Sequence, residues 1–286
     1  MATIVAAGTR ANAAPTVVAA ALLAAILTLM QATSAAAAAP TTVDLAMGDS
    51  LAVGDGASTP DRAYVPLLAE YFAGSAHGGA KQLVNVAVGG ETTSSILGSQ
   101  MANALAVIGD PNTDVRVISL SIGGNDLQVL LDEPSDPCVV DPSSFACQFG
   151  VAVALNGVAT RYPVILGTLA AALAADPGTE KVFVLTNYNP FGGTGSPYEV
   201  PVDFALLGSD LAIDCLAIQT DPARAGLNDL IACSAAAFGD IVVDVYPVIG
   251  DDALALTHIG DPGFNVHPND DGHALVAKAH RRADRD

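Results

Sequence analysis

The fold is decided by the stretch TVDLAMGDSL, residues 42–51. Its first part, TVDLAM, is a short, mostly apolar run that stops at Gly48, and this pattern predicts a buried strand that ends in a sharp turn. Similar apolar runs recur further along the chain, with helical spacing between them. The later runs are Gln82–Val88, Val115–Ile122, Lys181–Thr186 and Ile241–Val245.

Apolar strands that alternate with helices indicate βαβ units, because parallel strands are covered on both faces. We therefore predict a three-layer α/β/α, flavodoxin-like fold with a parallel sheet of about five strands. A kink or break is expected at Pro163, since proline removes a helical hydrogen bond. The predicted segments are helices at 92–108, 151–175, 202–238 (interrupted near 220–224) and 273–282, and long loops at 134–147 and 187–201.

The N-terminal segment has the order of a secretory signal peptide. Residues 1–39 contain no acidic residue and one basic residue, Arg10, followed by an apolar run at 17–30 and small residues at 32–39. We predict a signal peptide at 1–39, cut somewhere in 34–39, and a single domain at 40–286. An uncleaved anchor is the alternative, but the apolar run is shorter than the roughly 20 residues of a membrane span.

Composition limits the class of partner. Half of the 286 residues are hydrophobic, so a sizeable core is feasible, and the formal net charge is −19. Such an acidic chain disfavours nucleic acid and anionic membrane surfaces as partners. No feature demands an oligomer, so we expect a monomer.

The cysteines are expected to form disulfides, because export places the chain in an oxidising compartment. Three pairings of Cys138, Cys147, Cys215 and Cys233 are possible, and we favour Cys138–Cys147 with Cys215–Cys233, which close short loops. Neither the cysteines nor the histidines have the spacing of metal ligands, so we expect no metal and no other cofactor.

Residues able to carry out acyl transfer follow the predicted strands. In an open parallel sheet, ligands bind at the carboxyl ends of the strands. Ser50, Gly90 and Asn125 lie in such turns, and His267 lies between the last strand and the last helix. Taken singly, each has a simpler interpretation, such as an N-cap serine or a surface histidine. Together they supply a hydroxyl, a base and donors for an oxyanion.

Four short motifs occur in a characteristic order. They are Gly48–Leu51 (GDSL), Asn85-x-Ala87-x-x-Gly90-x-Thr92, Gly123–Asp126 (GGND) and His267–Asn269 (HPN). In this order they resemble the successive blocks of the SGNH hydrolases, also called the GDSL lipase/esterase family. The similarity runs from about Thr42 to the last helix, so it implies one SGNH hydrolase domain.

The resemblance implies a role for each matching position. Ser50 is expected to be the nucleophile and His267 its general base. The oxyanion hole is expected to consist of the backbone N–H groups of Ser50 and Gly90 and the side-chain amide of Asn125.

One position departs from the family pattern. The family usually places an aspartate three residues before the histidine, where this chain has Phe264. Asp261, the side chain of Asn265 or a main-chain carbonyl could orient the imidazole instead. We favour a dyad supported by a carbonyl or by Asp261.

These residues predict a secreted serine carboxylic-ester hydrolase acting through an acyl-enzyme on Ser50. The substrate is a small-molecule, lipid or carbohydrate ester. A carbohydrate O-acetylesterase of the same fold is one alternative. A secreted glycan- or lipid-binding module without activity is another, and it requires Ser50 to be unreactive.

Overall fold

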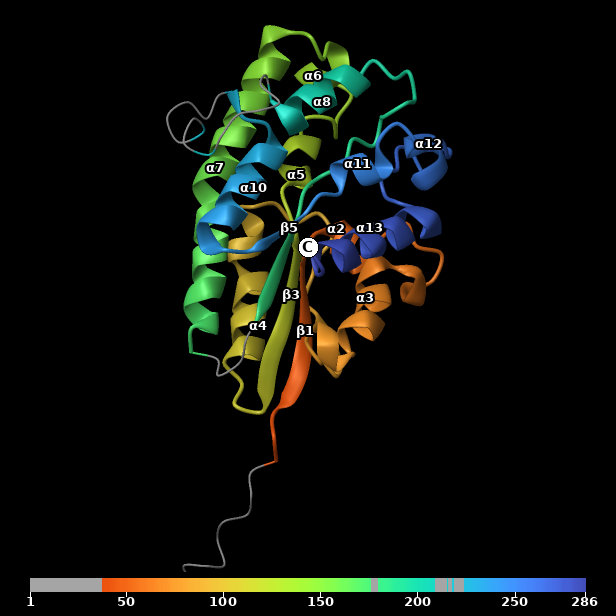
Figure 1. Cartoon of the computed structure of the whole chain (residues 1–286). Coiled ribbons are helices and arrows are strands. Elements are labelled where there is room, and N and C mark those ends of the chain that lie inside the picture. The colour runs from red at the N-terminus through yellow and green to blue at the C-terminus, as the bar shows by residue number, and fades with distance from the viewer. Residues whose placement is uncertain (1–37, 176–179, 209–214, 216–217, 219–223) are drawn as a thin grey trace, which may run out of the picture. The chain divides into compact units, whose positions relative to one another are not determined.

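A computed structural model describes residues 38–175, 180–208, 215, 218 and 224–286, so the predicted signal peptide lies almost entirely outside the described residues. Within them, five parallel strands form one sheet in the order β2-β1-β3-β4-β5, which confirms the predicted α/β fold (Figure 1). The strands are β1 (Thr41–Gly48), β2 (Gln82–Asn85), β3 (Thr113–Ser121), β4 (Lys181–Leu185) and β5 (Ile241–Val243).

Helices cover both faces of the sheet (Figure 1). The core on one face is built with α4, α7 and α10, and the core on the other with α3 and α13. The helices are α2 (Ser50–Val53), α3 (Tyr64–Phe72), α4 (Ser99–Ile108), α5 (Gly124–Gln128), α6 (Pro137–Val140), α7 (Phe145–Leu173), α8 (Glu199–Leu207), α10 (Leu227–Phe238), α11 (Tyr246–Ile249), α12 (Ala253–Leu256) and α13 (Asp270–Ala283), with short 3₁₀ helices η1 (Pro60–Arg62), η2 (Ser75–His77) and η3 (Ser95–Leu97).

The sheet order places the candidate residues together. The chain leaves β1 for β2 on one side of the sheet and then crosses to β3 on the other, so the crevice at the carboxyl ends lies between β1 and β3. Ser50 follows β1 and Asn125 follows β3 at this crevice. The sheet therefore brings residues of the first and third motifs to one edge.

Helix α7 differs from the sequence prediction in where it begins and in its continuity at Pro163. It runs unbroken through Pro163, so the expected break there is wrong, and it begins inside the segment predicted as a loop. Its start is explained by Ser144, whose side chain accepts a hydrogen bond from the Cys147 N–H. Buried residues on both sides of Pro163, including Tyr162 and Ile165, hold the helix against the core.

Among the described residues, α7 is the one helix long and apolar enough to cross a membrane. Leu155, Val158 and Ile165 on one side of it are buried in the core that covers the sheet. Core packing therefore accounts for one side of α7, while Phe145, Phe149 and Val153 on the helix are exposed.

Two disulfides tie helices to their neighbours. Cys138 in α6 pairs with Cys147 in α7, and Cys215 pairs with Cys233 in α10, which is the predicted pairing. The Cα–Cα distances are 4.6 and 5.3 Å. Disulfides persist in oxidising compartments, so both bonds are compatible with an extracellular protein.

Asp44 on β1 gives a prediction about stability. Its side chain is buried, one carboxyl oxygen lacks a hydrogen-bond partner among the described residues, and burial raises its pKa from 3.8 to about 7. In the unfolded chain the Asp44 carboxyl ionises near pH 3.8. The contribution of Asp44 to the free energy of unfolding is therefore most favourable below that pH, falls as the pH rises towards 7, and is constant above pH 7. We expect Asp44→Asn to raise the free energy of unfolding at pH 8 by on the order of a few kcal/mol, and to change it little at pH 4.

Urea unfolding at the two pH values measures this difference. The exposed Asp61 provides the control, because Asp61→Asn removes the same charge from a solvated position. A gain in stability of equal size at both pH values would show that the amide acts by hydrogen bonding and not by removing a buried charge.

Candidate active site

Ser50 lies at the N-terminus of α2, just after a turn whose first residue, Gly48, has a backbone conformation that favours glycine. Gly48 has φ of +130°, and a Cβ atom there would lie 1.9 Å from the carbonyl oxygen of Ser121 on β3. The neighbouring Asp49 donates its backbone N–H to the same oxygen at 2.9 Å. The glycine therefore lets β1 and β3 approach closely just before Ser50.

Asp49 holds this turn from inside. Its carboxylate accepts hydrogen bonds from the Leu51 N–H and the Ser121 hydroxyl, both at 3.1 Å, so it acts as the N-cap of α2. The side chain is buried, and burial raises its pKa to about 7. This geometry agrees with a structural role in the turn.

His267 faces Ser50 although 217 residues separate them, and its Nε2 lies 2.9 Å from the Ser50 Oγ. The loop that carries His267 is closed at its base by an antiparallel bridge between Thr257 and Pro268. Within it, the His258 N–H donates to the His267 carbonyl at 2.9 Å. The loop is thus fixed at both ends next to the turn that carries Ser50.

Asn265 determines which imidazole nitrogen carries the proton. Its Oδ1 lies 3.1 Å from the His267 backbone nitrogen and 2.8 Å from the His267 Nδ1. A backbone N–H only donates, so the atom facing it is the carbonyl oxygen of the amide and not its nitrogen. The same oxygen accepts from Nδ1–H, which leaves the Nε2 lone pair directed at Ser50.

Asp261 does not reach His267, which corrects our preferred sequence interpretation. Its carboxylate lies 2.6 Å from the Nδ1 of His258, and the side chain of Asn265 holds His267 instead. Asn265 precedes His267 by two residues, so its side chain can accept from the His267 backbone N–H as in an Asx turn. The turn at Gly263, with φ of +101°, lies between Asp261 and His267. Phe264 is 55% exposed and packs against Phe191.

Two further histidines connect the His267 loop and α13 to the segment after Ser50. The Nε2 of His258 lies 2.8 Å from the Gly56 carbonyl, and the Nε2 of His273 lies 3.0 Å from the Asp55 carbonyl. His273 is fully buried. The hydrogen bond that His258 donates to the Asp261 carboxylate raises the pKa of His258, with a smaller contribution from the Gly56 carbonyl.

The environment of His267 favours the neutral imidazole. Burial lowers its pKa below 6.5, and the nearby carboxylate of Asp55 opposes this shift in part. His258 lowers the pKa further. A neutral imidazole with a free lone pair is the form that can accept a proton from a hydroxyl.

The other two oxyanion-hole candidates, Gly90 and Asn125, lie in the loop after β2 and in the first turn of α5. Gly90 has φ of +78°, and a Cβ atom there would meet nothing within 4 Å, so its backbone conformation is what calls for glycine. Asn125 donates one amide hydrogen to the Glu91 carbonyl at 2.8 Å. Asn125 lines the same cavity as Ser50 and His267, whereas Gly90 is not among the residues of its wall.

A buried ion pair that sequence reasoning missed supports these loops. The Asp126 carboxylate accepts from the N–H and the hydroxyl of Thr93, both at 2.7 Å, and from Arg161 at 3.0 Å. Asp126 therefore ties α5 to the loop after β2. No local pattern in the sequence indicates this contact, because Arg161 comes from the middle of α7.

An apolar cavity of about 150 Å³ extends from Ser50 between α5, α6, α7 and α8. The disulfide of Cys138 and Cys147 forms part of its wall. The larger apolar side chains that line it are Leu127, Leu130, Leu131, Val151, Phe191, Tyr198, Val202, Leu206 and Phe264.

Among the described residues, no group of three or more His, Cys, Asp or Glu side chains is placed to hold a metal ion. Ser50, His267 and Asn125 thus line an apolar cavity, and Asn265 holds His267 from outside it. A hydroxyl beside a neutral imidazole at an apolar cavity is an arrangement compatible with acyl transfer.

The sequence model of the GDSL-like Lipase/Acylhydrolase family matches residues 46–275. The chain therefore belongs to this family of ester hydrolases. No curated protein matches the chain.

Solved structures share the fold. Phospholipase A1 from Streptomyces albidoflavus NA297 is 21% identical, with a TM-score of 0.56 over 86% of this chain and 99% of that one. The lipase Lip_vut3 from a goat rumen metagenome is 21% identical, with a TM-score of 0.52 over 85% and 97%. A mutant of Axe2, an acetyl-xylooligosaccharide esterase from Geobacillus stearothermophilus, is 17% identical, with a TM-score of 0.51 over 86% and 95%. At these identities the likeness concerns the fold.

Proposed function

We propose that this protein is an exported serine carboxylic-ester hydrolase that forms an acyl-enzyme on Ser50. The observation that carries the proposal is the 2.9 Å contact between the Ser50 Oγ and a His267 Nε2 whose lone pair is free. The N-terminal segment and the two disulfides support export.

In the proposed reaction, His267 takes the hydroxyl proton as the Ser50 Oγ attacks the ester carbonyl carbon. The negative oxygen of the tetrahedral intermediate accepts from the N–H groups of Ser50 and Gly90 and from the second amide hydrogen of Asn125. The intermediate collapses, and His267 returns the proton to the leaving alcohol. Water, activated by His267, then hydrolyses the acyl-enzyme. Asn265 keeps the imidazole in the required tautomer throughout.

The apolar wall of the cavity favours fatty-acyl esters over acetylated carbohydrates. An acetyl group would leave most of the cavity unfilled, whereas an apolar cavity of about this volume accommodates a six-carbon ring such as benzene. We therefore propose that the cavity binds an acyl chain of roughly six carbons.

A series of p-nitrophenyl esters tests the substrate class. Each buried methylene contributes about 0.8 kcal/mol, so the four methylenes that distinguish hexanoate from acetate are expected to raise kcat/KM by about 10²-fold. Beyond roughly eight carbons we expect no further gain, because the chain leaves the cavity. Initial rates below KM with acetate, butyrate, hexanoate, octanoate and palmitate give the profile.

The alternatives predict different profiles. An optimum at acetate would favour the carbohydrate O-acetylesterase. A lack of activity on every ester, together with no labelling of Ser50 by a fluorophosphonate probe, would favour the binding module and refute the hydrolase.

The state of His267 determines the pH dependence. His267 must be neutral to act as base, and burial lowers its pKa below 6.5, so the rate should stay at its maximum through pH 7 and fall only below pH 6.5 as the imidazole is protonated. The measurement is kcat/KM for p-nitrophenyl hexanoate between pH 4 and 9, followed at the isosbestic wavelength of the product. An acid limb centred above pH 7 would contradict a buried, neutral His267.

A further inference from the structure

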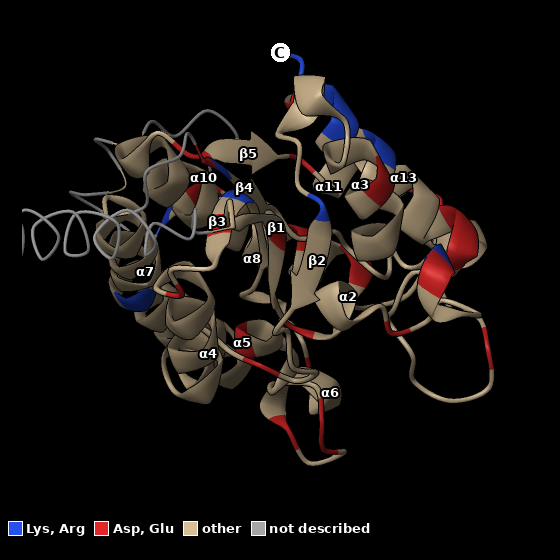
Figure 2. Ribbon diagram, turned by 90° about the horizontal axis from the view of Figure 1, so that it is seen from below, with Lys and Arg blue, Asp and Glu red and all other residues tan. Residues whose placement is uncertain are grey.

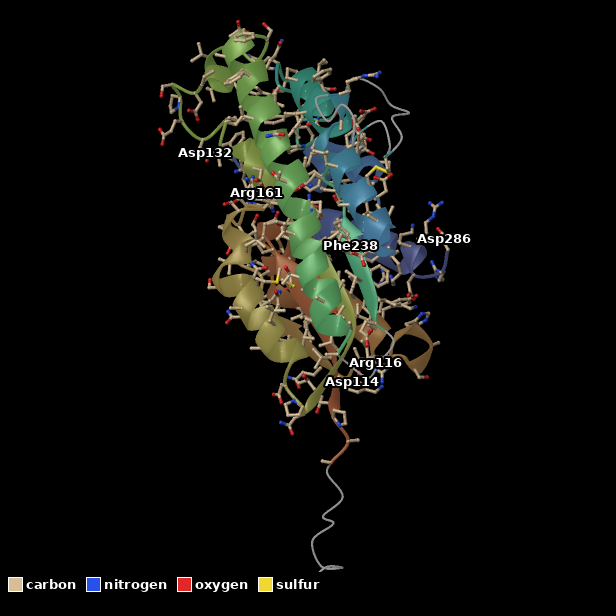
Figure 3. The ribbon with its side chains drawn as sticks, turned by 90° about the vertical axis from the view of Figure 1, so that its left-hand side faces the viewer. Asp114, Arg116, Asp132, Arg161, Phe238 and Asp286 are labelled. Atoms are coloured by element: carbon tan, nitrogen blue, oxygen red, sulfur yellow. A yellow bond between two sulfur atoms is a disulfide. The ribbon has the colours of Figure 1, made fainter. Side chains whose placement is uncertain are left out.

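Exposed hydrophobic side chains gather on the helices that build the outer wall of the cavity. Figures 1 and 3 show α6, the first turns of α7, and α8 at the same end of the described unit, beyond the carboxyl ends of the strands. Large apolar side chains on these helices are 57–82% exposed. We call this set the apolar end: Val140, Phe145, Phe149, Val153, Val200 and Phe204.

The spacing shows that these helices are apolar on two sides. On α7, Phe145, Phe149 and Val153 recur every four residues and form one stripe. Cys147 and Val151, on the opposite side of the same turns, line the cavity. The rings of Phe145 and Phe149 stack on each other with centroids 6.2 Å apart. Packing against the cavity therefore explains the inner face of α7 but not its outer stripe.

Helix α8 repeats this arrangement. Val200 and Phe204 are four residues apart and exposed, while Pro201 and Ala205 line the cavity. Exposed apolar patches on a soluble domain mark interaction sites, and the stacked rings of Phe145 and Phe149 form such a patch at the start of α7.

The charge around the apolar end limits the partner. Residues 117–160 and 182–223 contain no lysine or arginine, and both contain several acidic residues. Figure 2 shows acidic segments on α5 and next to α6, and the nearby basic residue Arg161 on α7 is paired with Asp126 of α5. An anionic lipid surface or a nucleic acid would be repelled here, whereas an uncharged or zwitterionic surface would not.

We propose that the apolar end docks the protein on a neutral or zwitterionic lipid–water interface. The inner sides of these helices line the cavity that leads to Ser50. Docking through their outer sides therefore brings the cavity wall next to the phase in which long-chain esters reside. Docking serves catalysis only if the proposed ester hydrolase function holds, but binding to the interface can be measured without catalysis.

The test uses the Ser50→Ala protein, purified from the culture medium, and sedimentation with phosphatidylcholine vesicles. We expect binding, and we expect Phe145→Ser combined with Phe149→Ser to weaken the partition by about 100-fold, or about tenfold for each ring. Phe238→Ser, at an exposed phenylalanine on α10 away from the apolar end (Figure 3), should change it less than twofold. Replacing half of the phosphatidylcholine with phosphatidylglycerol should weaken binding.

Soluble and interfacial substrates separate docking from chemistry. With Ser50 intact, the Phe145→Ser/Phe149→Ser protein should hydrolyse dissolved p-nitrophenyl butyrate at the wild-type rate and lose activity on esters held in vesicles. If no ester is hydrolysed but the vesicle results stand, the proposed function fails and the docking surface survives. The docking proposal is overturned if vesicle binding is absent, is insensitive to the paired substitutions, or is stronger with phosphatidylglycerol. A dimer that the same substitutions dissociate would assign the apolar end to a second copy of the chain and also overturn it.

Discussion

Replacing Ser50 with alanine is expected to lower kcat for p-nitrophenyl hexanoate by on the order of 10⁴–10⁶-fold. The substitution removes the hydroxyl proposed to attack the ester, while the proposed oxyanion donors remain. The residual rate is therefore that of water attack in the same site. Among the described residues the Ser50 hydroxyl is hydrogen bonded to His267 alone, so the thermal midpoint should change little.

Ser58 provides a matched control for this substitution. Ser58 lies in the loop that follows α2, at the surface, and its hydroxyl donates to the Asp270 carboxylate at 2.7 Å. Ser58→Ala should keep kcat within about twofold, since a surface substitution of this kind is worth a fraction of a kcal/mol. A fluorophosphonate probe should label the wild type and Ser58→Ala but not Ser50→Ala. Equal activity in Ser50→Ala and wild type would remove Ser50 from the mechanism.

Replacing Asn265 with leucine is expected to lower kcat by about 10²–10³-fold. Leucine has nearly the same volume but accepts no hydrogen bond, so the His267 Nδ1–H loses its partner and the imidazole is free to rotate or to take the other tautomer. Asn265 is not among the residues lining the cavity, so KM should change little. Steady-state kinetics with p-nitrophenyl hexanoate at pH 8 separate the two parameters.

Two further variants distinguish orientation from charge. Asn265→Asp keeps an acceptor on Nδ1 and adds a negative charge, so it should retain or raise kcat, by up to about tenfold, and move the acid limb to higher pH. Asp261→Asn removes a carboxylate that contacts His258 and not His267, so kcat should stay within about threefold. If Asp261→Asn instead lost as much activity as Asn265→Leu, a carboxylate would be acting on His267 after all.

The sequence predicted the parallel sheet and the positions of Ser50 and His267 because both depend on local patterns. An apolar run followed by glycine marks the end of a buried strand, and a serine after such a turn is exposed at the sheet edge. The partner of His267 could not be predicted in the same way. It depends on the backbone path from Asp261 to Asn265, which a left-handed glycine redirects.

The burial of His273 has a signal in the sequence. His273, Val276, Ala277 and His280 follow the spacing of one helix face, and all four are buried against the sheet or α3. Reading the two histidines as part of that apolar stripe would have placed them in the core. In contrast, the contact of Arg161 with Asp126 joins distant elements and has no local signature. The continuation of α7 through Pro163 likewise depends on tertiary packing that overrides a local preference.

The separation of 217 residues between Ser50 and His267 has a consequence for synthesis. Ser50 is made well before His267 and α13, and His273 on α13 contacts the segment after Ser50. A growing chain therefore carries the Ser50 hydroxyl without the imidazole proposed to activate it until α13 has packed. During refolding, the onset of hydrolysis of a chromogenic ester is then expected to report when α13 has packed beside the segment after Ser50.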